Sequence, residues 1–193
     1  MGFNLQIKAV NICGLGIHKN SKYRTHPVPY KIKEIVSSAK YVPTIYGLLE
    51  TQLNFNHRRI KLPRGIRYLG ETSGDRSKGG GSGGIFLFND SAIEVSNKKQ
   101  DVNVIISEYA IFAKVKYYDV ELNIIFVYIP HETKKCIESL VAIDKFIEDK
   151  QLNQFIIIGD FNISFESKYH ISKIRRLREF LLKHKLFDIL LVN

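Results

Sequence analysis

The chain has 193 residues, of which 45% are hydrophobic, and this composition suits a single globular domain with a substantial core. Its 29 Lys and Arg outnumber 19 Asp and Glu, and the formal net charge of +10 favours a polyanionic partner, either nucleic acid or an anionic membrane surface. No apolar run approaches the ~20 residues of a membrane span, and the N-terminus has no secretory pattern. Cys13 and Cys136 lack metal-ligand spacing, so we expect reduced thiols in an intracellular protein, with a disulfide as the alternative.

The first half of the chain predicts a β-α-β unit. Apolar and polar residues alternate along residues 3–11, which indicates a strand that ends at Asn11. Residues 31–40 place their apolar side chains on one face of a helix, and a second apolar strand follows over residues 45–50 and ends at Glu50.

A basic stretch and a glycine-rich stretch follow this unit. The basic stretch contains Arg58, Arg59, Lys61 and Arg64, and it is interpreted either as a track for a phosphate backbone or as a solvated loop. Gly74 to Gly84 is rich in Gly and Ser and leads into an apolar strand at residues 85–88. We expect a loop within one domain here, because the flanking segments are too short to stand alone; a flexible linker is the alternative.

The second half predicts antiparallel strands and then another β-α-β unit. The strands are expected at residues 92–95, 102–107, 109–117 and 121–129. A helix over residues 133–150 is expected to turn its apolar side chains inward, namely Ile137, Leu140, Val141, Phe146 and Ile147. A basic amphipathic helix over residues 168–185 should have Ile171, Ile174, Leu177 and Leu181 as its apolar stripe. Its charges, including Lys173, are expected on a solvated face, with nucleic-acid contact as the minority interpretation.

The most informative stretch is the run from Phe155 to Asn162. Four apolar residues, three of them β-branched, predict a buried strand, and this strand is followed by Gly159, Asp160 and Asn162. Ligands collect at the carboxyl ends of strands in α/β sheets, so Asp160 and Asn162 are candidate site residues. The alternative is that Asp160 only opens a turn that Asn162 caps.

The two halves therefore share one plan, in which each second strand ends in a lone carboxylate. Two sheets packed face to face, with the helices outside, would bury these strands. If corresponding strand ends meet, the site contains Asn11, Glu50, Tyr128, Asp160 and Asn162. This set has no nucleophile-base pair and no soft ligands, and its oxygen atoms suit Mg²⁺.

Five motifs in order resemble the endonuclease/exonuclease/phosphatase superfamily, whose fold is a two-sheet α/β sandwich of the DNase I-like type. The motifs are Asn11-Ile12-Cys13-Gly14-Leu15, Leu49-Glu50-Thr51, the glycine-rich run through Ile85, Val127-Tyr128-Ile129-Pro130 and Gly159-Asp160-Phe161-Asn162. The glycine-rich run, with Leu-Glu-Thr upstream, most resembles the apurinic-type endonuclease domain of non-LTR retrotransposons. The resemblance covers nearly the whole chain.

The resemblance implies hydrolysis of a phosphodiester with Mg²⁺, or Mn²⁺ as the alternative ion. Glu50 would hold the metal and Asn11 would order that corner of the site. Asp160 would orient or deprotonate the attacking water, while Asn162 and Tyr128 would donate hydrogen bonds to the phosphate. The implied partner is DNA, with a fused reverse transcriptase domain in a longer element and an intracellular, nuclear location.

Departures from the family pattern limit this expectation. The closing Ser-Asp-His motif is absent, so we expect residues 1–193 to form one domain that is incomplete at its C-terminus, lacks its last strands and has weak activity or none. His131 stands where many relatives carry Asn, and we expect it to be a loop residue. Two alternatives stay open: a phosphatase or phospholipid hydrolase of the same superfamily, and a non-catalytic remnant that binds nucleic acid.

Overall fold

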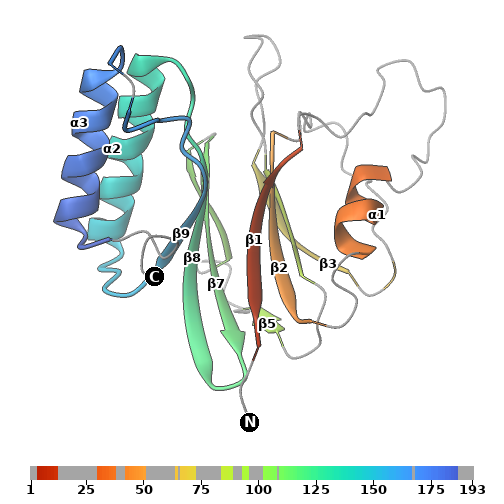
Figure 1. The fold of residues 1–193 in the computed structure, drawn as a ribbon. Helices are drawn as coiled ribbons and strands as arrows, with labels where there is room; N and C mark the ends of the chain where they lie inside the picture. Colours follow the sequence, from red (N-terminus) through yellow and green to blue (C-terminus); the bar gives the residue numbers. More distant parts are fainter. Residues whose placement is uncertain are drawn as a thin grey trace.

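The computed structural model describes residues 4–12, 30–37, 42–50, 64, 66–72, 84–88, 93–95, 102–107, 109–166 and 168–186. Two β-sheets lie at the centre, and helices lie on their outer sides (Figure 1). α1 (Tyr30–Ser37) lies beside the first sheet, whereas α2 (Thr133–Asp149) and α3 (Ile171–Lys183) cover the second. The expected two-sheet α/β sandwich is confirmed. No helix in the described ranges is long and apolar enough to cross a membrane.

The first sheet has the strand order β1-β2-β4-β3. Its strands are β1 (Gln6–Asn11), β2 (Thr44–Leu49), β3 (Arg67–Thr72) and β4 (Gly84–Phe88). β1 and β2 are parallel, with Asn11 opposite Leu49, so the predicted β-α-β unit is present. β4 runs antiparallel between β2 and β3, and it therefore joins the strand that ends before Glu50 to the strand after the basic stretch.

The second sheet has the order β5-β7-β8-β9, and β6 also pairs with β7. Its strands are β5 (Ile93–Val95), β6 (Val102–Ser107), β7 (Ala110–Tyr117), β8 (Val120–Tyr128) and β9 (Ile156–Asp160). β6 pairs with β7 and β7 with β8 in antiparallel fashion, as expected of successive strands, whereas β5 pairs with β7. β8 and β9 are parallel. Tyr128 lies opposite Asp160 in the pairing of β8 with β9, so the two strands of the second β-α-β unit also end side by side.

Successive side chains of β8 point to opposite faces of its sheet and fill two separate cores. Ile124 and Phe126 pack in the core between the two sheets, which also contains Ile45 of β2. Ile125 and Val127 pack beneath α2 and α3. The segment from Ile124 to Val127 of β8 is therefore apolar without interruption, because both faces of the strand are covered there.

The two sheets approach each other closely where β2 crosses β8. A Cβ atom added at Gly47 would lie 2.2 Å from Cδ1 of Phe126, so only glycine fits beneath this ring. The close contact brings the carboxyl ends of β2 and β8 to the same region of the molecule. Glu50 directly follows β2, and Tyr128 is the last residue of β8.

The burial of β9 and of α2 differs from the sequence-based expectation. β9 is half-buried rather than fully buried, because among the described strands it pairs with β8 alone. Val141 is 47% exposed, whereas Cys136, Ile143 and other residues form the inner face of α2.

The apolar stripe of α3 is also displaced from the predicted one. Ile171 is 71% exposed because the helix begins at this residue rather than at Lys168. Phe180, at 0% exposed, joins Ile174 and Leu177 in the buried face, and so does Lys173, at 1% exposed. The expectation that Lys173 belongs to a solvated face is therefore wrong.

Candidate active site

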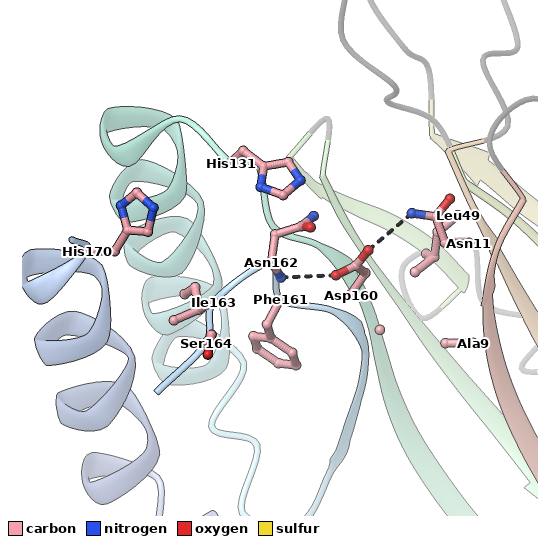
Figure 2. Close-up of a pocket in the computed structure, with 11 residues that line it drawn as sticks. Ala9, Asn11, Leu49, His131, Asp160, Phe161, Asn162, Ile163, Ser164 and His170 are labelled. Carbon is pink, nitrogen blue, oxygen red and sulfur yellow. Dashed lines mark hydrogen bonds between the residues drawn. The ribbon is translucent and has the colours of Figure 1, made fainter. Parts of the chain in front are cut away.

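A hydrogen bond between two strand ends joins the two sheets. Asn11 ends β1 and Asp160 ends β9, and these two strands lie in contact across the sandwich. Nδ2 of Asn11 donates to Oδ2 of Asp160 at 3.1 Å (Figure 2). The amide thereby fixes one oxygen of the carboxylate in place.

The second oxygen of Asp160 is held by the turn that follows β9. The backbone N–H of Asn162 donates to Oδ1 of Asp160 at 3.0 Å, so Asp160 does open a turn, as the simpler interpretation expects. The Asn162 side chain is also ordered, because its Nδ2 donates to the carbonyl oxygen of Ile129 at 2.9 Å. Asp160 can therefore belong both to the turn and to the site, because Oδ1 accepts from the turn backbone and Oδ2 accepts from Asn11.

Glu50 and Tyr128 form a second pair next to this carboxylate. Burial raises the pKa of the Tyr128 phenol, and a hydrogen bond to Glu50 together with the negative charges of Glu50 and Asp160 raises it further. A hydrogen bond from Asn162 acts in the opposite direction and is outweighed. Tyr128 is therefore a neutral hydrogen-bond donor at physiological pH.

The backbone around the site adopts conformations that L-residues rarely take. Glu50 has φ 53° and Asn162 has φ 49°. Gly159 has φ 156°, and a Cβ atom there would lie 1.9 Å from the carbonyl oxygen of Val127. Glycine is therefore required immediately before Asp160. Unfavourable backbone conformations gathered around polar side chains are typical of functional sites.

A cavity of about 680 Å³ opens above Asp160. Its polar lining includes Asn11, Asp160, Asn162, His131, Ser164 and His170. Figure 2 shows His131 and Asp160 on either side of Asn162. Glu50 and Tyr128 are outside the lining and join the site through the contacts of Tyr128 with Glu50 and Asn162.

A buried lysine holds the segment that carries His131. Nζ of Lys173, on α3, donates to the carbonyl oxygen of His131 at 2.8 Å. A buried ammonium group is costly unless it is hydrogen-bonded, so this contact stabilises the lysine as well as the segment. α3 therefore contributes to the site although none of its own residues lines the cavity.

The structure brings together all five residues proposed at the strand ends: Asn11, Glu50, Tyr128, Asp160 and Asn162. Of the proposed phosphate-backbone track, Arg58, Arg59 and Lys61 lie outside the described residues, as does most of the glycine-rich run. Arg64 is described and is exposed.

Two histidines that the sequence did not assign to the site line the cavity. His131 lies in a loop, as expected, and its place directly after Tyr128-Ile129-Pro130 is the signal for its approach to the site. His170 is exposed, and no local pattern in the sequence places it at the cavity. Its position follows from where α3 begins, and this depends on packing between distant segments.

The oxygen donors of the site fit a magnesium ion. Within the described residues, no group of three or more His, Cys, Asp and Glu side chains is arranged to hold a metal. Glu50 and Asp160 instead offer two carboxylates that both act on Tyr128. Mg²⁺ usually takes one or two carboxylates and completes its shell with water and substrate phosphate, so this sparse set suits it.

No protein-family model matches the chain, and no curated protein matches it by sequence. Among solved structures, it is similar to the endonuclease domain of TRAS1, a telomere-specific non-LTR retrotransposon, with a TM-score of 0.58 and 17% identity over 94% of this chain and 72% of that chain. It is also similar to a D. rerio TDP2 humanized by 14 mutations, with a TM-score of 0.53 and 14% identity over 89% of this chain and 66% of that one. The chain therefore shares the DNase I-like fold of these two proteins.

Proposed function

We propose that this protein hydrolyses phosphodiester bonds in DNA as an endonuclease of the retrotransposon type. The observation that carries the proposal is the hydrogen-bonded set Asn11–Asp160–Asn162 where the two sheets meet, with Glu50 and Tyr128 beside it. The similarity to the TRAS1 endonuclease domain supports the choice of reaction. The net charge of +10 supports DNA as the substrate.

Asp160 is the group that orients a water molecule for attack on phosphorus and accepts its proton. Both of its oxygens are already held, by Asn11 and by the Asn162 backbone. A carboxylate fixed in this way loses little entropy when it positions the water, and general-base assistance contributes roughly 10²–10⁴-fold to a rate.

Tyr128 and Asn162 stabilise the negative charge that develops on the phosphate oxygens. The phenol keeps its proton because its pKa is raised by burial and by Glu50, so it remains a donor. Asn162 is held through Ile129, which leaves its orientation little freedom. Without substrate the phenol donates to Glu50 and the amide donates to Ile129 and to Tyr128, so both donors exchange these partners for the phosphate oxygens when DNA binds.

Glu50 would hold Mg²⁺ or Mn²⁺, with Asn11 ordering the same corner. A divalent ion at this position supplies neutralisation of the charge on the phosphate and on the leaving oxygen. A nuclear location and an adjoining reverse transcriptase would accompany an endonuclease of the retrotransposon type, and they belong to the same proposal.

The proposal is tested by nicking of supercoiled plasmid DNA in Mg²⁺, in Mn²⁺ and in EDTA. We expect weak nicking with either ion, none in EDTA, and a loss of at least about 100-fold for Asp160→Asn. Asp149→Asn is the matched control, because Asp149 is an exposed carboxylate at the end of α2.

Two results would contradict the proposal. One is the absence of nicking by the wild-type protein with both ions, and the other is unchanged nicking by Asp160→Asn. Salt-dependent DNA binding without cleavage would instead indicate a non-catalytic nucleic-acid-binding protein. Turnover of a phosphoinositide in preference to DNA would indicate the phosphatase or phospholipid hydrolase alternative.

A further inference from the structure

Three large apolar side chains are exposed within a short stretch between β9 and the first turn of α3. Phe165 is 49% exposed, Tyr169 is 92% exposed and Ile171 is 71% exposed. The hydrophobic effect disfavours leaving such side chains in water, and when several occur close together they commonly mark a binding surface. We call Phe165, Tyr169 and Ile171 the apolar rim.

The apolar rim borders the cavity of the candidate active site. Ser164 and His170 both line that cavity (Figure 2). Ser164 directly precedes Phe165, and His170 stands between Tyr169 and Ile171 in the chain. A molecule whose phosphate occupies the cavity would therefore extend past the rim.

The charges around the rim favour nucleic acid as the molecule that covers it. The guanidinium of Arg178 lies 5.7 Å from the centre of the Phe165 ring. Lys168 is exposed next to Tyr169, and the side chain of Arg175 is 78% exposed on the first turns of α3, where it also pairs with Glu179 at 3.7 Å. Exposed aromatic side chains among cations, beside a phosphate site, are the arrangement on which bases stack while the backbone is neutralised.

We propose that Tyr169 stacks on a nucleobase that flanks the phosphate held in the cavity, and that Phe165 and Ile171 contact the same unstacked region. This inference rests on the proposed function and narrows its substrate. A base cannot stack on Tyr169 while it is stacked between its neighbours in a duplex, so single-stranded, frayed or mismatched DNA binds more tightly than intact duplex.

The test measures the affinity of the full chain in EDTA, where DNA is bound but not cleaved, for oligonucleotides that carry 2-aminopurine. Fluorescence anisotropy gives the Kd, and quenching of 2-aminopurine reports stacking. Wild type should bind a single strand and a mismatched duplex more tightly than the matched duplex. Tyr169→Ala should weaken the first two by about tenfold and abolish the quenching, whereas Tyr169→Phe should retain both.

Tyr118→Ala is the matched control. Tyr118 is 50% exposed in the turn before β8, and the nine residues of β8 separate this turn from the site, which corresponds to roughly 30 Å. This variant should bind every oligonucleotide as wild type does. Thermal melting should show that Tyr169→Ala is folded, since its side chain is almost fully in water.

The outcomes separate the two proposals. Tight binding by wild type, with equal affinity and quenching for Tyr169→Ala, overturns the stacking inference and leaves the nuclease proposal intact. A uniform loss of affinity for all oligonucleotides in Tyr169→Ala, with no change in preference, also overturns it. If wild type binds no oligonucleotide at all, the proposed function itself fails, and the wild-type measurement alone shows this.

Discussion

The side chains of Asn11 and Asp160 are joined by a 3.1 Å hydrogen bond across 149 positions of sequence. Each residue ends a strand of a different sheet, so this contact fixes the sheets relative to each other at the point where the proposed chemistry takes place. The bond is exposed to solvent, and its contribution to the free energy of unfolding is therefore small, about 1 kcal/mol or less. Its greater effect is on the orientation of the carboxylate.

The first prediction concerns Asn11→Ala. We expect the nicking rate to fall by roughly tenfold or more, because Asp160 loses the donor that fixes Oδ2. Asn123→Ala is the control: Nδ2 of Asn123 donates to the carbonyl oxygen of Gln154 at 2.9 Å, also exposed, before β9 begins. Both variants should unfold at similar denaturant concentrations, and only Asn11→Ala should lose activity. Equal activities would show that the Asn11 bond has no role in positioning.

The second prediction concerns Tyr128→Phe. Removing the hydroxyl deletes the hydrogen bond to Glu50 and a donor toward the phosphate, so we expect nicking to fall by about 10- to 100-fold at pH 7.5. Tyr117→Phe serves as the control in the same assay, because Tyr117 ends β7 at the far end of the sheet. An activity of Tyr128→Phe equal to that of wild type would remove Tyr128 from the site.

The raised pKa of Tyr128 also predicts how stability depends on alkaline pH. The unfolded state releases this proton near pH 10, whereas the folded state retains it, so the free energy of unfolding falls as the pH rises above about 10. Tyr128→Phe has no such proton. In denaturant titrations, the free energy of unfolding of wild type should therefore fall by about 1 kcal/mol relative to that of the variant between pH 8 and pH 11.

The third prediction concerns the buried Lys173. Lys173→Met keeps the apolar stem and removes the ammonium that donates to the His131 carbonyl. We expect little change in stability, because the lost hydrogen bond is offset by the removal of a buried charge. The KM for DNA should rise several-fold, since the segment with His131 loses its anchor. Lys145→Met, at an exposed position of α2, should change neither quantity.

The fourth prediction concerns Asp144, which joins α2 to α3. Its carboxylate, 8% exposed, accepts hydrogen bonds from Arg176 at 3.1 Å, from Lys183 at 2.8 Å and from His184 at 2.7 Å. Burial alone would raise the pKa of Asp144, but the bonds to Lys183, His184 and Arg176 outweigh it and lower the pKa. Asp144→Asn should therefore reduce the free energy of unfolding at pH 7 by about 3 kcal/mol.

The contribution of Asp144 should disappear in acid. A depressed pKa stabilises the fold above the unfolded value near 3.9, and this stabilisation is lost as the pH falls through the lower folded value. Wild type and Asp144→Asn should thus converge in stability as the pH falls toward 2. Glu148→Gln is the control, because Glu148 is 57% exposed and should contribute less than about 1 kcal/mol.

Local sequence patterns were sufficient for most of the architecture. The alternation in residues 3–11 and the apolar run before Gly159 indicate strands, and the helices between paired strands require parallel pairing of β1 with β2 and of β8 with β9. Parallel strands end at one edge of a sheet, and the meeting of Asn11 with Asp160 follows from this rule together with the packing of the two sheets.

Local sequence patterns did not predict the burial of individual side chains or the contacts between distant segments. The half-burial of β9 depends on how many strands flank it, and the burial of Lys173 depends on where the His131 carbonyl lies. The exposure of Ile171 and the place of His170 both follow from the start of α3, which differs from the predicted start by three residues, Lys168 against Ile171. Such features are set by tertiary packing, and periodicity carries no information about them.

The bond between Asn11 and Asp160 also bears on how the protein is made. A ribosome-bound chain contains the first β-α-β unit long before the second has been synthesised, and until residue 160 has left the exit tunnel the carboxylate that completes the site is not available. Every shorter translation product is thus unable to assemble the centre proposed for DNA cleavage. The centre proposed for DNA cleavage would therefore form only after both β-α-β units have been synthesised.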